Sequence, residues 1–228
     1  MYTVPKTNSL SNDDSAGQLD TFVFSGQVVV SQNAPLTPLY QLNRELTCAR
    51  QRNMAMIFES IQFTEVTNPD NTTRKRRTTE DLYYLVHPLN PDRQFDLPEY
   101  YVTAASPGTL GNIQLDITKA TFQVSQFKAM LNRDKSAVDA LLFNRDTQEL
   151  LFDIKLMLKS GQYEWVDTDG QRIAHESSRG EEYLLHLETS ILQEKKDALV
   201  ALWIVRLWHD AVEKEAKQTG ESTFGKLT

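Results

Sequence analysis

The sequence predicts a mainly β protein: a closed antiparallel β-barrel of about twelve strands that encloses a hydrophobic C-terminal helix. One observation is the segment 197–212, DALVALWIVRLWHDAV, which is apolar on every face. The other is the long series of short strand-like segments before it, which lacks the strand–helix alternation of a parallel sheet. Such a series is typical of a sandwich or a barrel.

The segment from Ala198 to Val205 is an unbroken apolar run that Arg206 interrupts. A surface helix keeps one polar face, so a helix that is apolar all round is buried on all sides. Ser190 and Gln193 are spaced as a capping box, which predicts a helix over about 191–216. A membrane span needs roughly 20 apolar residues, so we interpret this segment as a core helix.

Before the helix, segments rich in β-branched and aromatic residues alternate with turn-forming residues. Gly26 is expected as a bulge or a bend, a bulge is expected near Glu59, and Asp169-Gly170 is a strong hairpin signal. Residues 33–38 and 68–80 are expected as loops, the second as an exposed hairpin loop, and residues 1–20 and 218–228 as flexible tails around one domain, 21–217. The expected strands are 21–31, 39–47, 54–66, 81–87, 100–104 (a short edge strand), 112–118, 121–127, 140–143, 149–158, 162–166, 171–176 and 182–188.

The helix decides between the two all-β architectures. The sheets of a sandwich pack about 10 Å apart, and their own side chains fill the space between them. A helix with its side chains is about 10–12 Å across and fits inside a barrel of about twelve strands. Closure also removes edge strands, so the sequence favours a helix-filled barrel.

Four segments in the last third of the chain resemble the end of the tubby C-terminal-like superfamily. They are Gln162-Tyr-Glu-Trp165, Asp169-Gly170, Ile173-Ala-His-Glu176 and Asp197-Ala-Leu-Val-Ala-Leu-Trp203. That superfamily includes the tubby-like, LURP-one-related and phospholipid scramblase proteins, and the chain particularly resembles divergent tubby-like proteins of fungi. The resemblance implies a twelve-stranded barrel around a buried helix, with phosphoinositide binding and membrane-associated roles. The basic headgroup-binding residues of tubby proteins and the calcium-binding segment of scramblases have no clear counterpart here.

Composition narrows the range of functions. The net charge of −7 argues against a general nucleic-acid binder. Cys48 is the only cysteine, and the first residues lack the apolar core of a signal peptide. We therefore expect an intracellular, cytoplasmic protein, with peripheral membrane association and nuclear location as open alternatives.

The strongest charged feature is the run Arg74, Lys75, Arg76 and Arg77. Four cations can bind a phosphoinositide or another anionic membrane lipid at about 1 kcal/mol per charge. They can also act as a nuclear localisation signal, and the plainer alternative is a solvated loop. These four residues are the predicted ligand-binding site.

Other site chemistry is weakly indicated. The histidines, His87, His175, His186 and His209, have no metal-ligand spacing, so we expect neither a metal nor a cofactor. No motif identifies a catalytic residue. If the helix is enclosed, Arg206 needs a carboxylate or carbonyl partner, or must reach a barrel mouth.

The three tryptophans are interpreted as core residues in preference to ligand-pocket residues. They are Trp165, Trp203 and Trp208, and the two on the predicted helix lie about 140° apart around it, so both facing one pocket is disfavoured.

The sequence thus predicts a non-catalytic binding module that engages anionic lipid headgroups or a protein partner. The alternative is an enzyme of the cyclase or isomerase type, or a carrier, acting on a small apolar molecule between barrel and helix. A cavity between barrel and helix would support the alternative, and a solidly packed interior would count against it.

Overall fold

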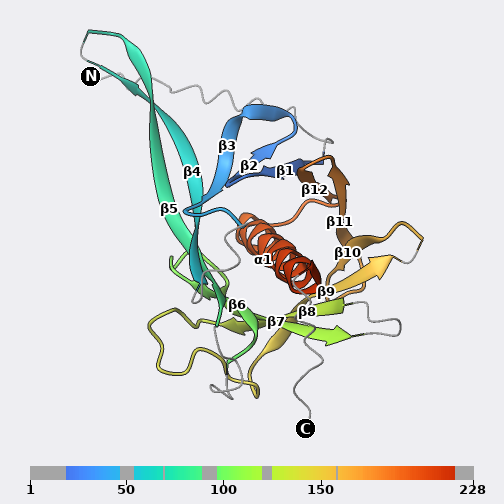
Figure 1. Cartoon of the computed structure of the whole chain (residues 1–228). Coiled ribbons are helices and arrows are strands. Elements are labelled where there is room, and N and C mark those ends of the chain that lie inside the picture. Colours follow the sequence, from blue (N-terminus) through green and yellow to red (C-terminus); the bar gives the residue numbers. More distant parts are fainter. Residues whose placement is uncertain are drawn as a thin grey trace.

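A computed structural model describes residues 19–46, 54–68, 70–88, 97–119, 125–157 and 159–218. The expected tails lie almost wholly outside these residues. In the described part, twelve antiparallel strands close into one barrel around a single helix, as the sequence predicts (Figure 1).

The barrel is a simple meander. Each strand pairs with its neighbour in sequence, and β1 pairs with β12 to close the ring. The strands are β1 (Thr21–Ser25), β2 (Val28–Ser31), β3 (Ala34–Leu42), β4 (Met54–Thr67), β5 (Thr73–His87), β6 (Tyr100–Ala104), β7 (Gly111–Lys119), β8 (Ser125–Arg133), β9 (Glu149–Met157), β10 (Gln162–Val166), β11 (Arg172–Arg179) and β12 (Glu182–Leu187).

Helix α1 (Gln193–Gln218) runs through the ring of strands (Figure 1). It begins two residues later than predicted, because the first helical hydrogen bond runs from the Lys196 amide to the Leu192 carbonyl. The Gln193 side chain does not return to Ser190 in a capping box; it donates hydrogen bonds to Tyr40 and Asp197. The side chain of Gln193 therefore links the start of the helix to Tyr40 of β3.

The core forms where the inner faces of the strands meet the helix. Every residue from Ala198 to Val205 is fully buried, with no accessible surface. Trp165, Trp203 and Trp208 are also buried and pack edge-on against aromatic neighbours, for instance Trp203 against Phe24 at 6.2 Å between ring centroids. The interpretation of the tryptophans as core residues is confirmed.

Several predicted boundaries are wrong. Residues 21–31 form two strands, because the chain reverses at Gly26 with φ of +63°. Residues 33–38, expected as a loop, mostly belong to β3, where Ala34 to Thr37 are exposed and prolines fit an irregular pairing with β2. Residues 140–143 form no strand. The expected edge strand 100–104 is β6, which pairs on both sides and is buried throughout.

Strands β4 and β5 extend far beyond the barrel as a two-stranded ribbon (Figure 1). β4 pairs with β3 only from Leu42–Phe58 to Tyr40–Ser60. The β4–β5 pairing, by contrast, continues to Thr67–Thr73, with a register shift at Phe58/Glu59 that confirms the predicted bulge. We call the outer part, residues 61–68 and 70–80, the cationic hairpin.

Candidate functional site

The predicted ligand-binding residues Arg74, Lys75, Arg76 and Arg77 lie on the cationic hairpin. The prediction that they belong to a loop is wrong. They lie in the first third of β5, and all four are exposed. Successive residues of a strand point to opposite faces. The run is therefore divided into two pairs, with Arg74 and Arg76 on one face of the ribbon and Lys75 and Arg77 on the other.

The two faces of the ribbon have different neighbours. Phe63 pairs with Arg77 across the strands, so it shares the face of Lys75 and Arg77, and 41% of its surface is exposed. Glu65 pairs with Lys75 on the same face. The Arg77 guanidinium also donates to the Gln41 side chain in β3. One face thus combines two cations, one carboxylate and an exposed aromatic ring.

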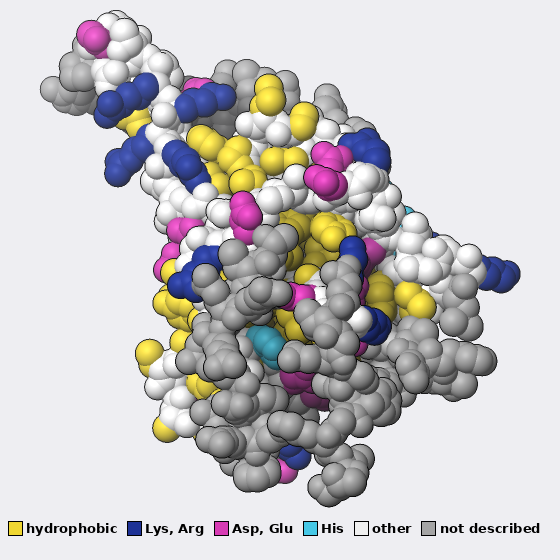
Figure 2. Space-filling view, in the orientation of Figure 1, with side chains coloured by type: hydrophobic (Ala, Val, Ile, Leu, Met, Phe, Trp, Pro, Cys, Tyr) yellow, Lys and Arg dark blue, Asp and Glu magenta, His cyan; other side chains and the backbone are white. Residues whose placement is uncertain are grey.

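The surface view shows cationic side chains along the hairpin (Figure 2). Dark blue side chains follow the hairpin away from the barrel, and hydrophobic side chains gather beside its inner end (Figure 2). The chain as a whole carries a net charge of −7, so the hairpin is a local cationic feature on an acidic protein.

A second candidate site is a cavity of about 470 Å³ at the end of the barrel where α1 begins, which we call the mouth cavity. Its apolar walls include Phe22 and Leu82. Its charged groups come from the chain just before β1, from β5 and from the first turns of α1; they are Asp20, Glu80, Lys196 and Asp197. Closure of the barrel therefore brings together residues from both ends of the chain.

A hydrogen-bonded group forms the floor of this cavity. The Tyr40 hydroxyl donates to Asp197 Oδ1 at 2.6 Å, and Gln193 Nε2 donates to the same oxygen at 2.7 Å. Gln193 Nε2 also lies 3.1 Å from the Tyr40 hydroxyl. Ser60, which pairs with Tyr40 across β3 and β4, lines the cavity, and its Oγ has no hydrogen-bond partner among the described residues.

Burial changes the acidity of the groups in this floor. It raises the pKa of Asp197 above its ordinary value, and the charge of Glu80 adds to the effect, although hydrogen bonds from Tyr40 and Gln193 oppose it. Burial, followed by the charge of Asp197, also raises the pKa of Tyr40 well above its ordinary value. Carboxyl groups with a raised pKa in a cleft are typical of functional sites.

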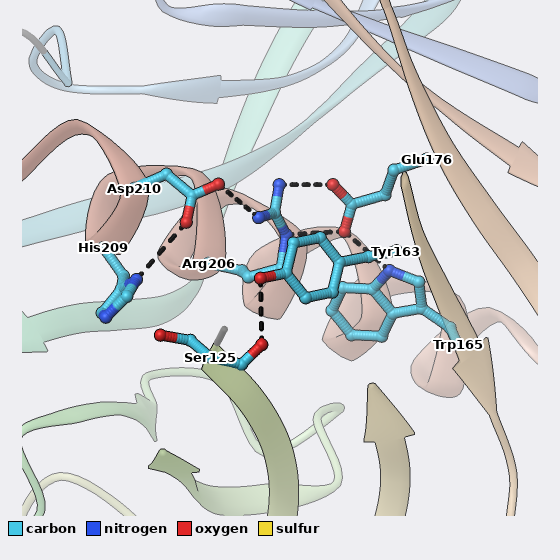
Figure 3. Close-up of polar contacts among 7 residues, drawn as sticks. All are labelled: Ser125, Tyr163, Trp165, Glu176, Arg206, His209 and Asp210. Carbon is cyan, nitrogen blue, oxygen red and sulfur yellow. Dashed lines mark hydrogen bonds and ion pairs between the residues drawn. The ribbon is translucent and has the colours of Figure 1, made fainter. Parts of the chain in front are cut away.

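At the other end of the helix, Arg206 lies in a buried polar network (Figure 3). Its Nε donates to Glu176 Oε1 at 2.6 Å, and another guanidinium nitrogen contacts Glu176 Oε2. A third nitrogen donates to Asp210 Oδ2 at 2.6 Å, and the guanidinium lies 4.5 Å from the ring centre of Tyr163. Trp165 Nε1 donates to Glu176 Oε1 at 2.9 Å. The prediction that Arg206 needs a carboxylate partner is confirmed.

Arg206 and Asp210 in this network are held in their charged forms, whereas burial raises the pKa of Glu176 above its ordinary value in spite of the charge of Arg206. Burial alone would lower the pKa of Arg206, but the charges of Glu176 and Asp210 outweigh burial and raise it. Burial opposes ionisation of Asp210, yet the hydrogen bond from His209 and the charge of Arg206 lower its pKa below the ordinary value. Because the arginine is surrounded by protein groups, its role is to fix α1 to β10 and β11.

The barrel wall brings together two histidines that are separated in the sequence. His175 and His186 pair across β11 and β12, and their rings stack 4.6 Å apart. His175 contacts Glu188, and His186 contacts Thr21 and Ser177. Within the described residues, no group of three or more histidine, cysteine, aspartate or glutamate side chains could hold a metal ion. Cys48 lies outside those residues.

The described part of the chain contains no helix with the length and apolar character needed to cross a membrane. Comparison with known proteins gave no match, either to a family model, to a curated protein or to a solved structure.

Proposed function

We propose that the protein is a non-catalytic binding module that engages anionic phospholipid headgroups through the cationic hairpin. The observation that carries this proposal is the projection of four exposed cations beyond the barrel, together with the exposed ring of Phe63. Among the described residues, the ribbon pairs with β3 and β6 only at its inner end, so these residues leave its outer part open to meet a surface.

The charges are sufficient for measurable binding. A cation near an anionic membrane contributes about 1 kcal/mol, so four give roughly 4 kcal/mol. Phe63 adds apolar area next to Arg77, and aromatic rings are favoured at the level of the headgroups. A protein that reaches the membrane in this way is located inside the cell and binds peripherally, which is the location we propose.

The packing around the middle of α1 counts against a carrier or enzyme site for a small apolar molecule there, and the mouth cavity lies at the start of the helix instead. The helix residues from Ala198 to Val205 have no accessible surface, so not even a water-sized space lies against them. Arg206 is likewise bound to Glu176 and Asp210 rather than facing a cavity. The second candidate function is that the same four cations bind a protein partner through an acidic surface on that partner.

The twelve-stranded barrel around a central helix also supports the resemblance to the tubby C-terminal-like superfamily. We propose that this chain binds lipid through the cationic hairpin and not through the basic residues that tubby proteins use, because those residues have no clear counterpart here.

Vesicle sedimentation tests the proposal. The wild-type protein should sediment with phosphatidylcholine vesicles that contain phosphatidylserine or a phosphoinositide, and remain in the supernatant with phosphatidylcholine alone. The variant with Arg74, Lys75, Arg76 and Arg77 all changed to alanine should bind roughly a thousandfold more weakly, since it loses roughly 4 kcal/mol.

A matched control removes four exposed cations from the barrel and its loops: Lys128, Arg145, Lys159 and Arg179, all changed to alanine. This control has the same net charge as the hairpin variant and should bind like the wild type. Equal losses in the two variants would show that net charge alone decides binding. Equal binding by wild type and hairpin variant would remove the proposed site.

A further inference from the structure

The mouth cavity has the size and the mixed lining of a ligand site. Its volume of about 470 Å³ falls within the range of roughly 300–1,000 Å³ that is usual for small-molecule sites, and barrel mouths are common places for them. Phe22, Leu39, Ile61 and Leu82 contribute apolar surface.

The charges around this cavity are unbalanced. Asp20, Glu80 and Asp197 contribute three carboxylates, against the single ammonium group of Lys196. Asp197 is only 9% exposed. Among the described residues it has no ion pair, and its hydrogen-bond donors, Tyr40 and Gln193, both reach Oδ1. Its second oxygen, Oδ2, receives no hydrogen bond from these residues.

A buried carboxylate without a cation is costly, and proteins usually pair such a group or neutralise it. At the opposite end of the helix, the buried carboxylate of Glu176 is paired with Arg206. The difference between the two ends indicates that the mouth cavity can take a further positive charge, which the described residues do not supply beyond the ammonium group of Lys196. Helix N-termini favour anions, but Asp20, Glu80 and Asp197 at the same end repel them.

We propose that the mouth cavity binds a small amphiphilic amine, whose ammonium group lies between Asp197 and Glu80 and whose apolar part packs against Phe22 and Leu82. The ammonium would donate to Oδ2 of Asp197 and to Glu80, which also accepts a hydrogen bond from Ser106. The cationic hairpin contributes Ile61, Gln62 and Glu80 from its inner end to this cavity, but none of its four cations lines it. The proposed amine site therefore does not depend on the proposed lipid binding.

The first test compares three probes of one shape by isothermal titration calorimetry and by two-dimensional NMR of the full chain. The probes are 2-phenylethylamine, 2-phenylethanol and phenylacetate. Only the amine should bind, with chemical-shift changes centred on the backbone amides of α1 residues 193–197 and on β3. Equal binding of the alcohol would show that the positive charge plays no part and would overturn the proposal. Tighter binding of phenylacetate would show that the cavity prefers an anion and would also overturn it.

The second test uses substitutions that keep shape. Asp197→Asn should weaken amine binding about tenfold or more, because the ammonium group then loses its charge-assisted hydrogen bond to the carboxylate. Glu80→Gln should give a smaller loss. Asp146→Asn, in the exposed loop before β9, is the control and should bind as the wild type does.

Unchanged amine affinity in both Asp197→Asn and Glu80→Gln would overturn the proposal, as would the absence of any amine binding to the wild type. If Asp197→Asn fails to fold, the comparison of the three probes on the wild type still decides the question. The hairpin variant should bind the amine normally, and Asp197→Asn should still bind anionic vesicles, so either proposal can fail alone.

Discussion

Arg206 of α1 and Glu176 of β11 form an ion pair in the interior, with 2.6 Å between Nε and Oε1 and with both side chains less than 10% exposed. The pair joins the central helix to the wall of the barrel. Loss of one partner leaves the other charge in an apolar environment.

We therefore predict that Arg206→Met or Glu176→Leu alone lowers the free energy of unfolding by about 3–5 kcal/mol. The double variant should lose less than the sum of the two, since neither charge is then left unpaired. Urea unfolding followed by tryptophan fluorescence measures all three. The exposed pair Arg133–Glu149 is the control, and Arg133→Ala should cost at most about 1 kcal/mol. Strict additivity of the two buried substitutions would contradict the prediction.

The division of the cationic run between two faces predicts an asymmetry in vesicle binding. A ribbon that lies flat on a membrane presents one face, and Phe63 marks the face of Lys75 and Arg77. The double change Lys75→Ala and Arg77→Ala should weaken binding by about thirtyfold, for two charges at about 1 kcal/mol each. The matched change of Arg74 and Arg76 should have a smaller effect in the same sedimentation assay. The reverse order would place the other face against the lipid.

Asp197 predicts an unusual dependence of stability on pH. Its folded-state pKa is raised above the ordinary value of 3.8, so the folded protein binds the proton more tightly than the unfolded chain does. The stabilisation that comes from this proton is complete below the unfolded pKa and is lost as the pH rises through the folded pKa. Once the pH exceeds the folded pKa, the ionised group destabilises the fold. Asp197→Asn should therefore be more stable than the wild type at pH 7.

Urea unfolding of both proteins from pH 3 to pH 8 measures this difference, which should shrink on acidification. A variant that is less stable at pH 7 would contradict the assignment. A stabilising substitution at a cavity is also the pattern expected where a group is kept for binding at the expense of stability.

Gly111, the first residue of β7, is at a position that only glycine fits. Its φ is +126°, and a Cβ atom there would lie 2.5 Å from the Asn132 carbonyl oxygen of β8. Gly111→Ala should cost more than about 2 kcal/mol, from backbone strain and displacement of the neighbouring strand. Thermal unfolding with Gly108→Ala as the control measures it, since at Gly108 the nearest atom, Ser106 Oγ, is 3.7 Å away. Similar melting temperatures for the two variants would contradict the prediction.

The sequence predicts correctly those parts of the fold that a few neighbouring residues determine by themselves. The run from Ala198 to Val205 is apolar on every face, and this pattern requires enclosure. The turn at Gly170 also forms as predicted, with φ of +79° at the glycine. Residues 73–80 of the cationic hairpin form a strand where a loop was expected, because a ribbon exposed on both faces needs no alternation of apolar residues.

Some side-chain contacts could have been predicted from the sequence and others could not. The His175–His186 pair follows from simple counting, because β11 and β12 are joined by a tight turn at Gly180 and Arg179 pairs with Glu182. Tyr40 and Asp197 are 157 residues apart in the chain. They meet only because the barrel closes around the helix, so no local pattern indicates their contact.

Helix α1 completes the interior. Because β12 joins β1 and α1 comes after β12, the apolar surface that faces the helix stays uncovered until α1 has been synthesised. Pairings between the two ends of the chain are slow to form, and growing chains with open sheet edges tend to aggregate. A nascent chain of this kind is expected to need chaperones at the ribosome, and a premature stop codon before Gln193 should leave no folded product.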